Sequence, residues 1–146
     1  TRLKLEHAVQ RLQRRGLPDG PVLCADTTVA LGRQILGKPE SPEHAAQILR
    51  QLSGQKHQVL TAVALAHQGQ IHQGLSRSTV QFAPLSEAQI AHYVASGEPM
   101  CKAGAYGIQG LAGLLIERIA GSYTGIMGLP AYETAQLLAA AGLAII

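Results

Sequence analysis

The stretch Lys-Ala-Gly-Ala-Tyr-Gly-Ile-Gln-Gly-Leu, residues 102–111, carries the most information about this chain. Gly104, Gly107 and Gly110 recur at every third position, and Gln109 presents an amide between two of them. Glycine at this density lets a backbone adopt positive φ and approach a neighbouring surface closely. The segment alone leaves two interpretations open, a turn packed against a neighbour or a loop that contacts a ligand.

Composition predicts one domain, residues 1–146, with a packed core. Hydrophobic residues make up 47% of the chain and charged residues 14%, which argues against disorder. No apolar run has the length of a membrane span, so we expect no membrane partner. Cys24 and Cys101 follow no disulfide or metal spacing, which favours a reduced, cytoplasmic protein.

The net charge of +3 is not a nucleic-acid signal, because of where the charges lie. Residues 1–15 sum to +4 and the remainder to −1, so the basic excess belongs to one amphipathic helix. The aromatic residues are scattered and provide no stacking platform for single strands. We therefore expect no nucleic-acid partner.

Hydrophobic periodicity and breaking residues predict alternating helices and strands. The expected helices contain Leu5 to Leu12, start at Ser41-Pro42-Glu43, start at Ser86 with Gln89 as a capping box, and start at Pro130. The expected strands are 22–25, a hairpin over 29–36, 57–66, 71–82 and 114–119. Because hairpins occur alongside helices, the expected fold class is α/β with a mixed sheet flanked by helices.

Asp26 is the first candidate for chemistry, since the strand at 22–25 is expected to end there. A carboxylate at a strand end can hold Mg²⁺ or accept a proton from water. The alternative is a turn cap, because Asp-Thr-Thr can bond its own backbone.

Other polar positions leave similar alternatives. Lys38 lies between Gly37 and Pro39, which suits a charge aimed at phosphate or a solvated turn. Lys56 and His57 are interpreted mainly as a helix C-terminal cap and surface. Glu98 with Lys102 is ambiguous. Gly121 to Gly125 can form an anion pocket or an ordinary helix cap.

Several of these segments, taken in order, resemble the Maf family. They are Ala25-Asp26-Thr27, Leu36 to Pro39, Leu52 to Thr61, Ala103 to Gly110, and Gly121-Ser122-Tyr123 through Gly128-Leu129-Pro130. Maf proteins are nucleoside triphosphate pyrophosphatases that were once named for septum formation. The Ala-Gly-Ala-Tyr-Gly-Ile-Gln-Gly version is similar to the branch that acts on dTTP and UTP.

The resemblance implies hydrolysis of dTTP or UTP, or of modified pyrimidine nucleotides, between the α- and β-phosphates with a divalent cation, Mg²⁺ or Mn²⁺. It implies a Maf and inosine-triphosphatase-like fold with a cleft between two lobes, and it allows a homodimer. Asp26 matches the proton acceptor, close to the metal. Thr27 and Gln109 match positions tied to substrate choice, and Lys38 and Lys102 match lysines near the phosphates.

The chain also departs from the family pattern. It lacks the Ser-x-Ser-Pro-Arg-Arg phosphate loop, so we expect it to lack the first strand and loop of the fold. Cys101 stands where the branch has an aspartate, and Gly125 where asparagine is common. The alternative function is therefore a non-catalytic nucleotide-binding or cell-division regulatory protein, inactive because the loop is absent.

Overall fold

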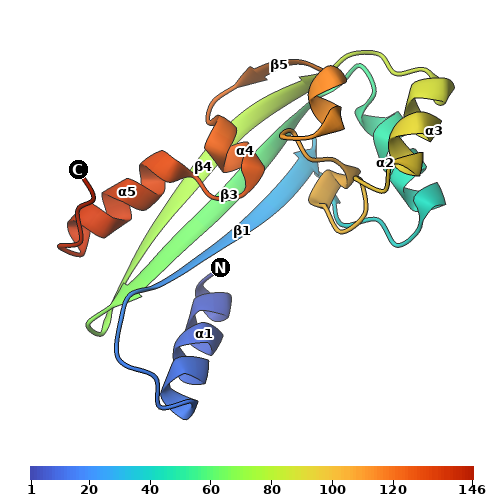
Figure 1. Cartoon of the computed structure of the whole chain (residues 1–146). Coiled ribbons are helices and arrows are strands. Elements are labelled where there is room, and N and C mark those ends of the chain that lie inside the picture. The colour runs from blue at the N-terminus through green and yellow to red at the C-terminus, as the bar shows by residue number, and fades with distance from the viewer.

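Five strands form one sheet in the order β2-β1-β3-β4-β5 in the computed structural model, which describes residues 1–146 (Figure 1). The strands are β1 (Val22–Leu31), β2 (Gln34–Leu36), β3 (Lys56–His67), β4 (Gln70–Phe82) and β5 (Ile116–Ala120). The α-helices are α1 (Arg2–Arg14), α2 (Pro42–Leu52), α3 (Glu87–Ala95), α4 (Tyr123–Met127) and α5 (Ala131–Ala140). Two 3₁₀ turns, η1 (Ala103–Ala105) and η2 (Leu111–Leu114), lie between α3 and β5.

The fold class is α/β as expected, but the expectation of a mixed sheet is wrong. Every neighbouring pair of strands is antiparallel. The reason is that each connection returns to the end of the sheet that it left. β3 begins beside the end of β1, where Ala30 pairs with Gln58, and β5 begins beside the end of β4, where Phe82 pairs with Ile116.

The two hairpins follow from local turn chemistry and confirm the sequence prediction. Gly32 takes φ +58° in the turn that pairs Leu31 with Gln34. Gln68 and Gly69 take φ values of +49° and +75° in the turn that pairs His67 with Gln70. Positive φ at both central residues matches the right-handed twist of the flanking strands, which fixes the register of β3 against β4.

The sequence suggested that the first strand ends at Asp26, and this expectation is wrong. β1 continues to Leu31, and Asp26, Thr27 and Thr28 pair with Ala62, Thr61 and Leu60 of β3. β-branched threonines fit a pleated strand, and the neighbouring strand satisfies the backbone groups that a turn would have used. Asp26 is therefore a mid-strand residue and not a turn cap.

Helix boundaries were well predicted where capping residues mark them. Ser41 accepts the His44 N–H at the start of α2, and Ser86 with Gln89 forms the predicted capping box of α3. α1 and α5 also appear where expected. The strand expected over 114–119 begins two residues later, and the short helix α4 was not predicted.

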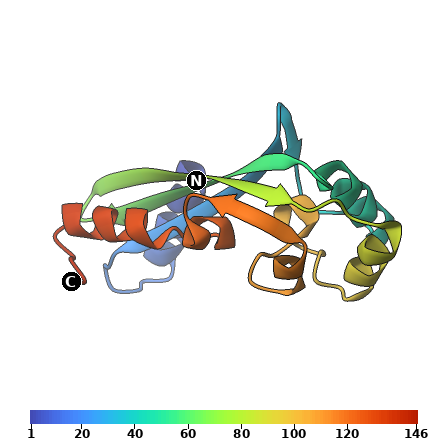
Figure 2. The same cartoon turned by 90° about the horizontal axis from the view of Figure 1, so that it is seen from above.

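The sheet has two unlike faces, since successive side chains of a strand point to opposite sides. One face carries Thr27, Val29, Val59 and Val63, and it is covered by α2, α4 and α5. The other face carries Asp26 and is partly covered by α1, whose side chains line a cavity with Val22, Ala66 and Ile71. Seen from above, α5 lies along the sheet, and α2 and α3 gather at its far end (Figure 2).

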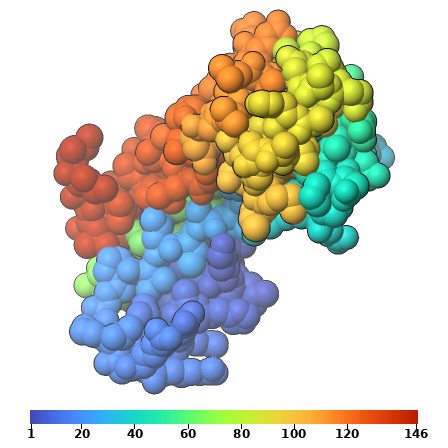
Figure 3. Space-filling model, turned by 45° about the vertical axis from the view of Figure 1, so that its right-hand side comes forward, coloured from blue at the N-terminus to red at the C-terminus, as the bar shows by residue number.

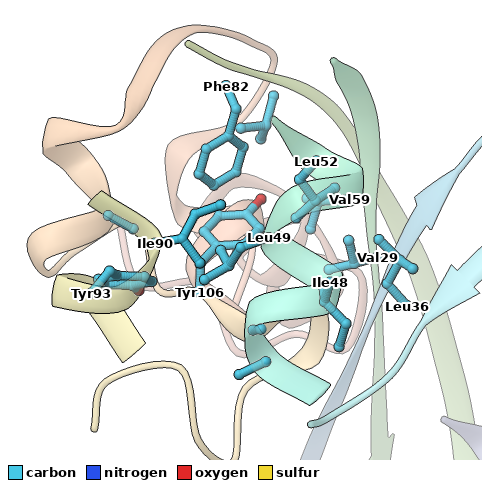
Figure 4. Close-up of a cluster of buried hydrophobic side chains, with 14 of the residues drawn as sticks. Val29, Leu36, Ile48, Leu49, Leu52, Val59, Phe82, Ile90, Tyr93 and Tyr106 are labelled. Atoms are coloured by element: carbon cyan, nitrogen blue, oxygen red, sulfur yellow. The ribbon is translucent and has the colours of Figure 1, made fainter. Parts of the chain in front are cut away.

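The principal core lies at the end of the sheet that carries α2 and α3, which we call the pocket end. Fifteen buried hydrophobic residues cluster there; ten of them are labelled in Figure 4. Phe82 and Leu49 are fully buried, and Tyr106 packs among them with its ring edge-on to Phe82 at 5.0 Å. This places the glycine-rich segment directly on the core. No helix is long and apolar enough to span a membrane.

Candidate functional site

A pocket of about 270 Å³ lies where the glycine-rich segment meets β1, β3 and α4. Thr27, Lys102 and Gln109, three residues singled out from the sequence, are among its lining. The walls are otherwise largely apolar; they include Val29, Val59, Tyr106, Ile108, Ile126 and Met127. An apolar pocket with a few convergent polar groups is the usual form of a small-molecule site.

Thr27 enters the pocket from β1 as part of a short chain of hydrogen bonds. Its hydroxyl lies 2.9 Å from the hydroxyl of Thr61 on β3. The Thr61 hydroxyl in turn donates to the backbone carbonyl of Gly125 at 2.7 Å. Thr61 is completely buried, so its bond to Gly125 is shielded from water.

The glycine-rich segment approaches its neighbours as closely as its composition suggested. Gly104 takes φ +72°, and a Cβ there would lie 2.9 Å from a methyl group of Val29. A Cβ on Gly107 would lie 2.7 Å from Cε of Lys102, so the lysine side chain crosses that glycine. In the space-filling view this yellow to orange segment sits above the blue of α1 and β1 (Figure 3). The first interpretation, a turn packed against a neighbour, is confirmed. A contact with a ligand stays a prediction, and the segment is placed for one because it lines the pocket.

Gln109 lies at the tip of a turn that closes with a hydrogen bond from Gly110 N–H to the carbonyl of Gly107 at 3.1 Å. The backbone is held on both sides of this turn. Gly107 N–H donates to the Tyr93 hydroxyl at 3.3 Å, and Leu111 N–H donates to Glu98 at 2.9 Å.

Tyr93 and Glu98 are joined to each other, and together they form a support for the turn that the sequence did not reveal. The Tyr93 hydroxyl donates to Glu98 at 2.7 Å. Burial opposes ionisation of Glu98, but hydrogen bonds from Tyr93 and two backbone amides, with the nearby charge of Lys102, leave its pKa lowered. Burial raises the pKa of Tyr93, so its hydroxyl stays protonated. The ambiguous Glu98 is thus a structural anchor; no local pattern could have shown its distant amide partners.

Asp26 lies outside the pocket lining. It directly precedes Thr27 in β1, and strand alternation sends the two side chains to opposite faces of the sheet. The side chain of Asp26 is exposed. Residues 22–28 of β1 have no strand on the side away from β3, because β2 pairs only with residues 29–31. At this open edge Lys4 donates to the carbonyl of Ala25 at 3.0 Å.

Lys38 is exposed and lies just after β2, outside the pocket lining. The carbonyl of the preceding residue, Gly37, accepts the Gly104 N–H at 3.1 Å. The structure therefore brings Lys38 next to the glycine-rich segment, although the two are far apart in sequence. Of the five candidate residues, three line one pocket, and Asp26 and Lys38 lie outside its lining.

His57 is not a surface residue, contrary to the sequence interpretation. Its side chain is 2% exposed, and its Nε2 lies 2.6 Å from the hydroxyl of Tyr106. Its Nδ1 has no hydrogen-bond partner. Burial lowers the pKa of His57 to about 4, so the ring is neutral at physiological pH. His57 supports the glycine-rich segment from below, through Tyr106, whereas Lys56 is exposed as expected.

The segment from Gly121 to Gly125 forms a helix cap, one of the two alternatives that the sequence left open. The Ser122 hydroxyl accepts the Gly125 N–H at 3.0 Å at the start of the five-residue helix α4. A Cβ on Gly125 would collide with the side chain of Ser76. Glycine at 125, where the family resemblance suggested asparagine, thus allows α4 to sit close to the sheet.

A larger cavity, of about 610 Å³, lies between α1 and the β3–β4 turn. None of the five candidate residues lines it. We favour the smaller pocket as the functional site, because converging polar groups and not volume determine recognition.

The side chains do not assemble a metal site by themselves. The chain contains no cluster of three or more histidine, cysteine, aspartate or glutamate side chains placed to hold an ion. Asp26 supplies one exposed carboxylate. That is compatible with Mg²⁺, which is commonly bound by one or two carboxylates together with substrate phosphates and water.

Comparison of the sequence with known proteins identifies the family of the chain. The family profile described as Maf-like protein matches residues 1–141. A protein named dTTP/UTP pyrophosphatase from Polaromonas sp. (strain JS666) is 59% identical over 145 residues, which cover 99% of this chain and 72% of that protein.

Two further relatives carry the same name. The protein from Albidiferax ferrireducens is 56% identical over 142 residues, covering 97% of this chain and 71% of its own length. The protein from Aromatoleum aromaticum is 59% identical over 139 residues, which cover 95% of this chain and 68% of that protein. Because the family profile matches residues 1–141 of this chain, the chain belongs to the Maf family.

Proposed function

We propose that this protein is a nucleotide pyrophosphatase that hydrolyses dTTP and UTP to the nucleoside monophosphate and pyrophosphate. The observation that carries the proposal is the pocket that gathers Thr27, Lys102 and Gln109 against apolar walls. The relatives that share 56–59% of their aligned residues with this chain are named for that activity.

The pocket suits a pyrimidine base better than a whole nucleotide. At about 270 Å³ it lies below the range of about 300–1,000 Å³ that is typical of drug-sized ligands. The base edge of uracil or thymine presents acceptor, donor and acceptor groups. The Gln109 amide can both donate and accept, and its place in the lining suits one of the base carbonyls.

The phosphates would then extend across the open edge of β1 toward Asp26. This path is needed because Thr27 and Asp26 lie on opposite faces of the strand. Lys102 lines the pocket, and Lys38 lies beside the glycine-rich segment, so both suit charge stabilisation of the triphosphate. We propose Asp26 as the proton acceptor for the attacking water. The water oxygen bonds to phosphorus, its proton passes to the carboxylate, and the bond to pyrophosphate breaks.

A divalent cation, Mg²⁺ or Mn²⁺, is part of this proposal. The residues present fit a cation that arrives with the triphosphate and is shared with Asp26, because no group of three or more ligand side chains could hold the ion alone. When bound, such an ion neutralises charge that develops on the phosphate oxygens. A cytoplasmic location is proposed as well, which agrees with two cysteines that are not joined in a disulfide.

The test is pyrophosphate release from dTTP and UTP with Mg²⁺, compared with the Asp26→Asn variant. We expect the variant to lower kcat by about 10²–10⁴-fold, the usual contribution of a general base. Asp19→Asn is the matched control, since Asp19 is also exposed but lines the other cavity.

No pyrophosphate from any triphosphate would overturn the proposed activity, and equal rates for wild type and Asp26→Asn would overturn the role of Asp26. Thermal stabilisation by UTP without any turnover would instead favour the non-catalytic nucleotide-binding protein.

A further inference from the structure

The hydrogen-bond chain beneath the pocket has a fixed direction, which can be worked out from its last member. A backbone carbonyl can only accept, so the single hydroxyl proton of Thr61 is used in its 2.7 Å bond to Gly125. At the contact between Thr61 and Thr27, 2.9 Å long, the Thr61 oxygen must therefore accept. The proton in that contact comes from Thr27.

The Gly125 carbonyl is held in place by further hydrogen bonds, so the direction of the hydrogen bonds through Thr61 is fixed. It also accepts the Gly128 N–H at 3.1 Å, so both of its lone pairs are used. The Gly125 N–H is bound to Ser122 at 3.0 Å, and the glycine packs directly on Ser76. Thr61 is fully buried, so no water competes for its bond to Gly125.

The consequence concerns what Thr27 offers to a ligand. Its only hydroxyl proton is engaged with Thr61, so its oxygen faces the pocket with acceptor lone pairs alone. Uracil and thymine carry an N–H at ring position 3, which an acceptor can bind. Cytosine carries an unprotonated nitrogen there, which would meet the same oxygen lone pair to lone pair.

We propose that Thr61 is a specificity-determining positioning residue, which makes Thr27 a pure acceptor and so selects uracil and thymine against cytosine. The inference rests on the proposed function, since it needs the base of a pyrimidine nucleotide in this pocket. Thr61 acts only through Thr27, because it does not line the pocket.

Thr61→Val is the decisive variant, because it keeps the shape of the side chain and removes the hydroxyl. Thr27 is then free to rotate its proton toward the pocket and to donate to cytosine. We expect the ratio of kcat/KM for dUTP over dCTP to fall about tenfold, mainly through KM for the cytosine nucleotide, as is usual for one hydrogen bond. Thr61→Ser restores the hydroxyl, and the ratio should stay within about twofold of wild type.

Thr134→Val is the matched control. Thr134 is a buried threonine on α5 whose hydroxyl has no hydrogen-bond partner, and it lies outside the pocket lining. A merely structural effect of removing a buried hydroxyl would change the rates for dUTP and dCTP together and leave their ratio unchanged. If Thr61→Val does not fold, Thr61→Cys provides a weak S–H donor of similar size. Its ratio of kcat/KM for dUTP over dCTP should lie below that of wild type, by less than tenfold.

Binding separates the failure of this inference from failure of the proposed function. Calorimetry with dUTP and dCTP analogues that carry a methylene group between the α- and β-phosphorus measures base selection without turnover. A wild type that neither binds nor cleaves these nucleotides would overturn both proposals. A wild type that prefers uracil, with the same preference in folded Thr61→Val, would overturn only the role of Thr61. A wild type that binds uracil and cytosine nucleotides equally well would also overturn the role of Thr61.

Discussion

The two ends of the sheet are built in different ways. At the pocket end, fifteen buried hydrophobic residues pack beneath the glycine-rich segment. At the other end, which we call the hairpin end, only Val63, Leu65 and Leu137 form a buried cluster, and a cavity of about 610 Å³ separates α1 from the β3–β4 turn.

The hairpin end relies instead on its backbone ladder. β3 and β4 pair continuously from Lys56 with Gln81 to His67 with Gln70. Backbone pairing fixes the register of strands, but it does not fix a loop. A glycine-rich segment gains order only from what it packs against, so the larger core holds the pocket in place.

Truncating one buried side chain in each cluster should change the free energy of unfolding most. Phe82→Ala should lower the free energy of unfolding by about 3–5 kcal/mol, because Phe82 is fully buried among many neighbours. Leu137→Ala, in the three-residue cluster, should cost about 2 kcal/mol, the low end for such a truncation. Denaturant unfolding measures both values. Equal losses would remove the distinction between the two ends.

A smaller effect should distinguish two glycines that both have positive φ. Gly104→Ala places a methyl group 2.9 Å from Val29 at φ +72°, so backbone strain and overpacking add to about 2–4 kcal/mol. Gly16, at the hairpin end, has φ +62° with nothing within 4 Å, so Gly16→Ala should cost only about 1–2 kcal/mol.

Thermal or denaturant unfolding of both glycine variants checks this difference. Adding Val29→Ala to Gly104→Ala should recover part of the loss, because it removes the methyl groups that the new side chain meets. A loss at Gly104 no greater than that at Gly16 would show that close packing on Val29 contributes nothing.

The pH dependence of stability should also originate at the pocket end. His57 has a pKa of about 4 in the folded protein and about 6.5 when unfolded, so the unfolded chain binds a proton first as the pH falls. Stability is therefore fully present above pH 6.5 and decreases toward pH 4. The expected loss is about 2 kcal/mol at pH 5.

Unfolding free energies between pH 7 and pH 5 test this prediction against His57→Phe, which keeps an aromatic ring but cannot bind a proton. The variant should lose most of the slope, even if it is less stable throughout because the Tyr106 hydroxyl loses its partner. An unchanged slope in the variant would assign the pH dependence to other groups.

Much of the fold could be predicted because its signals are local. A serine that caps its own helix, as at Ser41 and Ser86, acts within three residues. The Gly32 and Gly69 turns likewise act within a hairpin. The glycine spacing of residues 104–110 also predicted a close backbone approach, but it did not identify the residue that is approached.

The errors share one physical cause, which is that the missing information lay in a distant partner. The strand through Asp26 continues because β3 pairs with it, and His57 is buried because Tyr106 and Phe82 pack on it from elsewhere in the chain. A polar residue looks the same in sequence whether its hydrogen-bond partner is water or a buried tyrosine.

The candidate site shows the same division. The types of residue available could be read without a structure, namely an acid, two lysines, a threonine and an amide, together with the glycines that allow close packing. Folding brings Thr27 and Gln109 into one pocket and places Asp26 on the other face of β1. It also sets Thr61 as the acceptor of the hydrogen bond from Thr27. The direction of a hydrogen bond depends on every group in its chain, and those groups come together only in the folded protein.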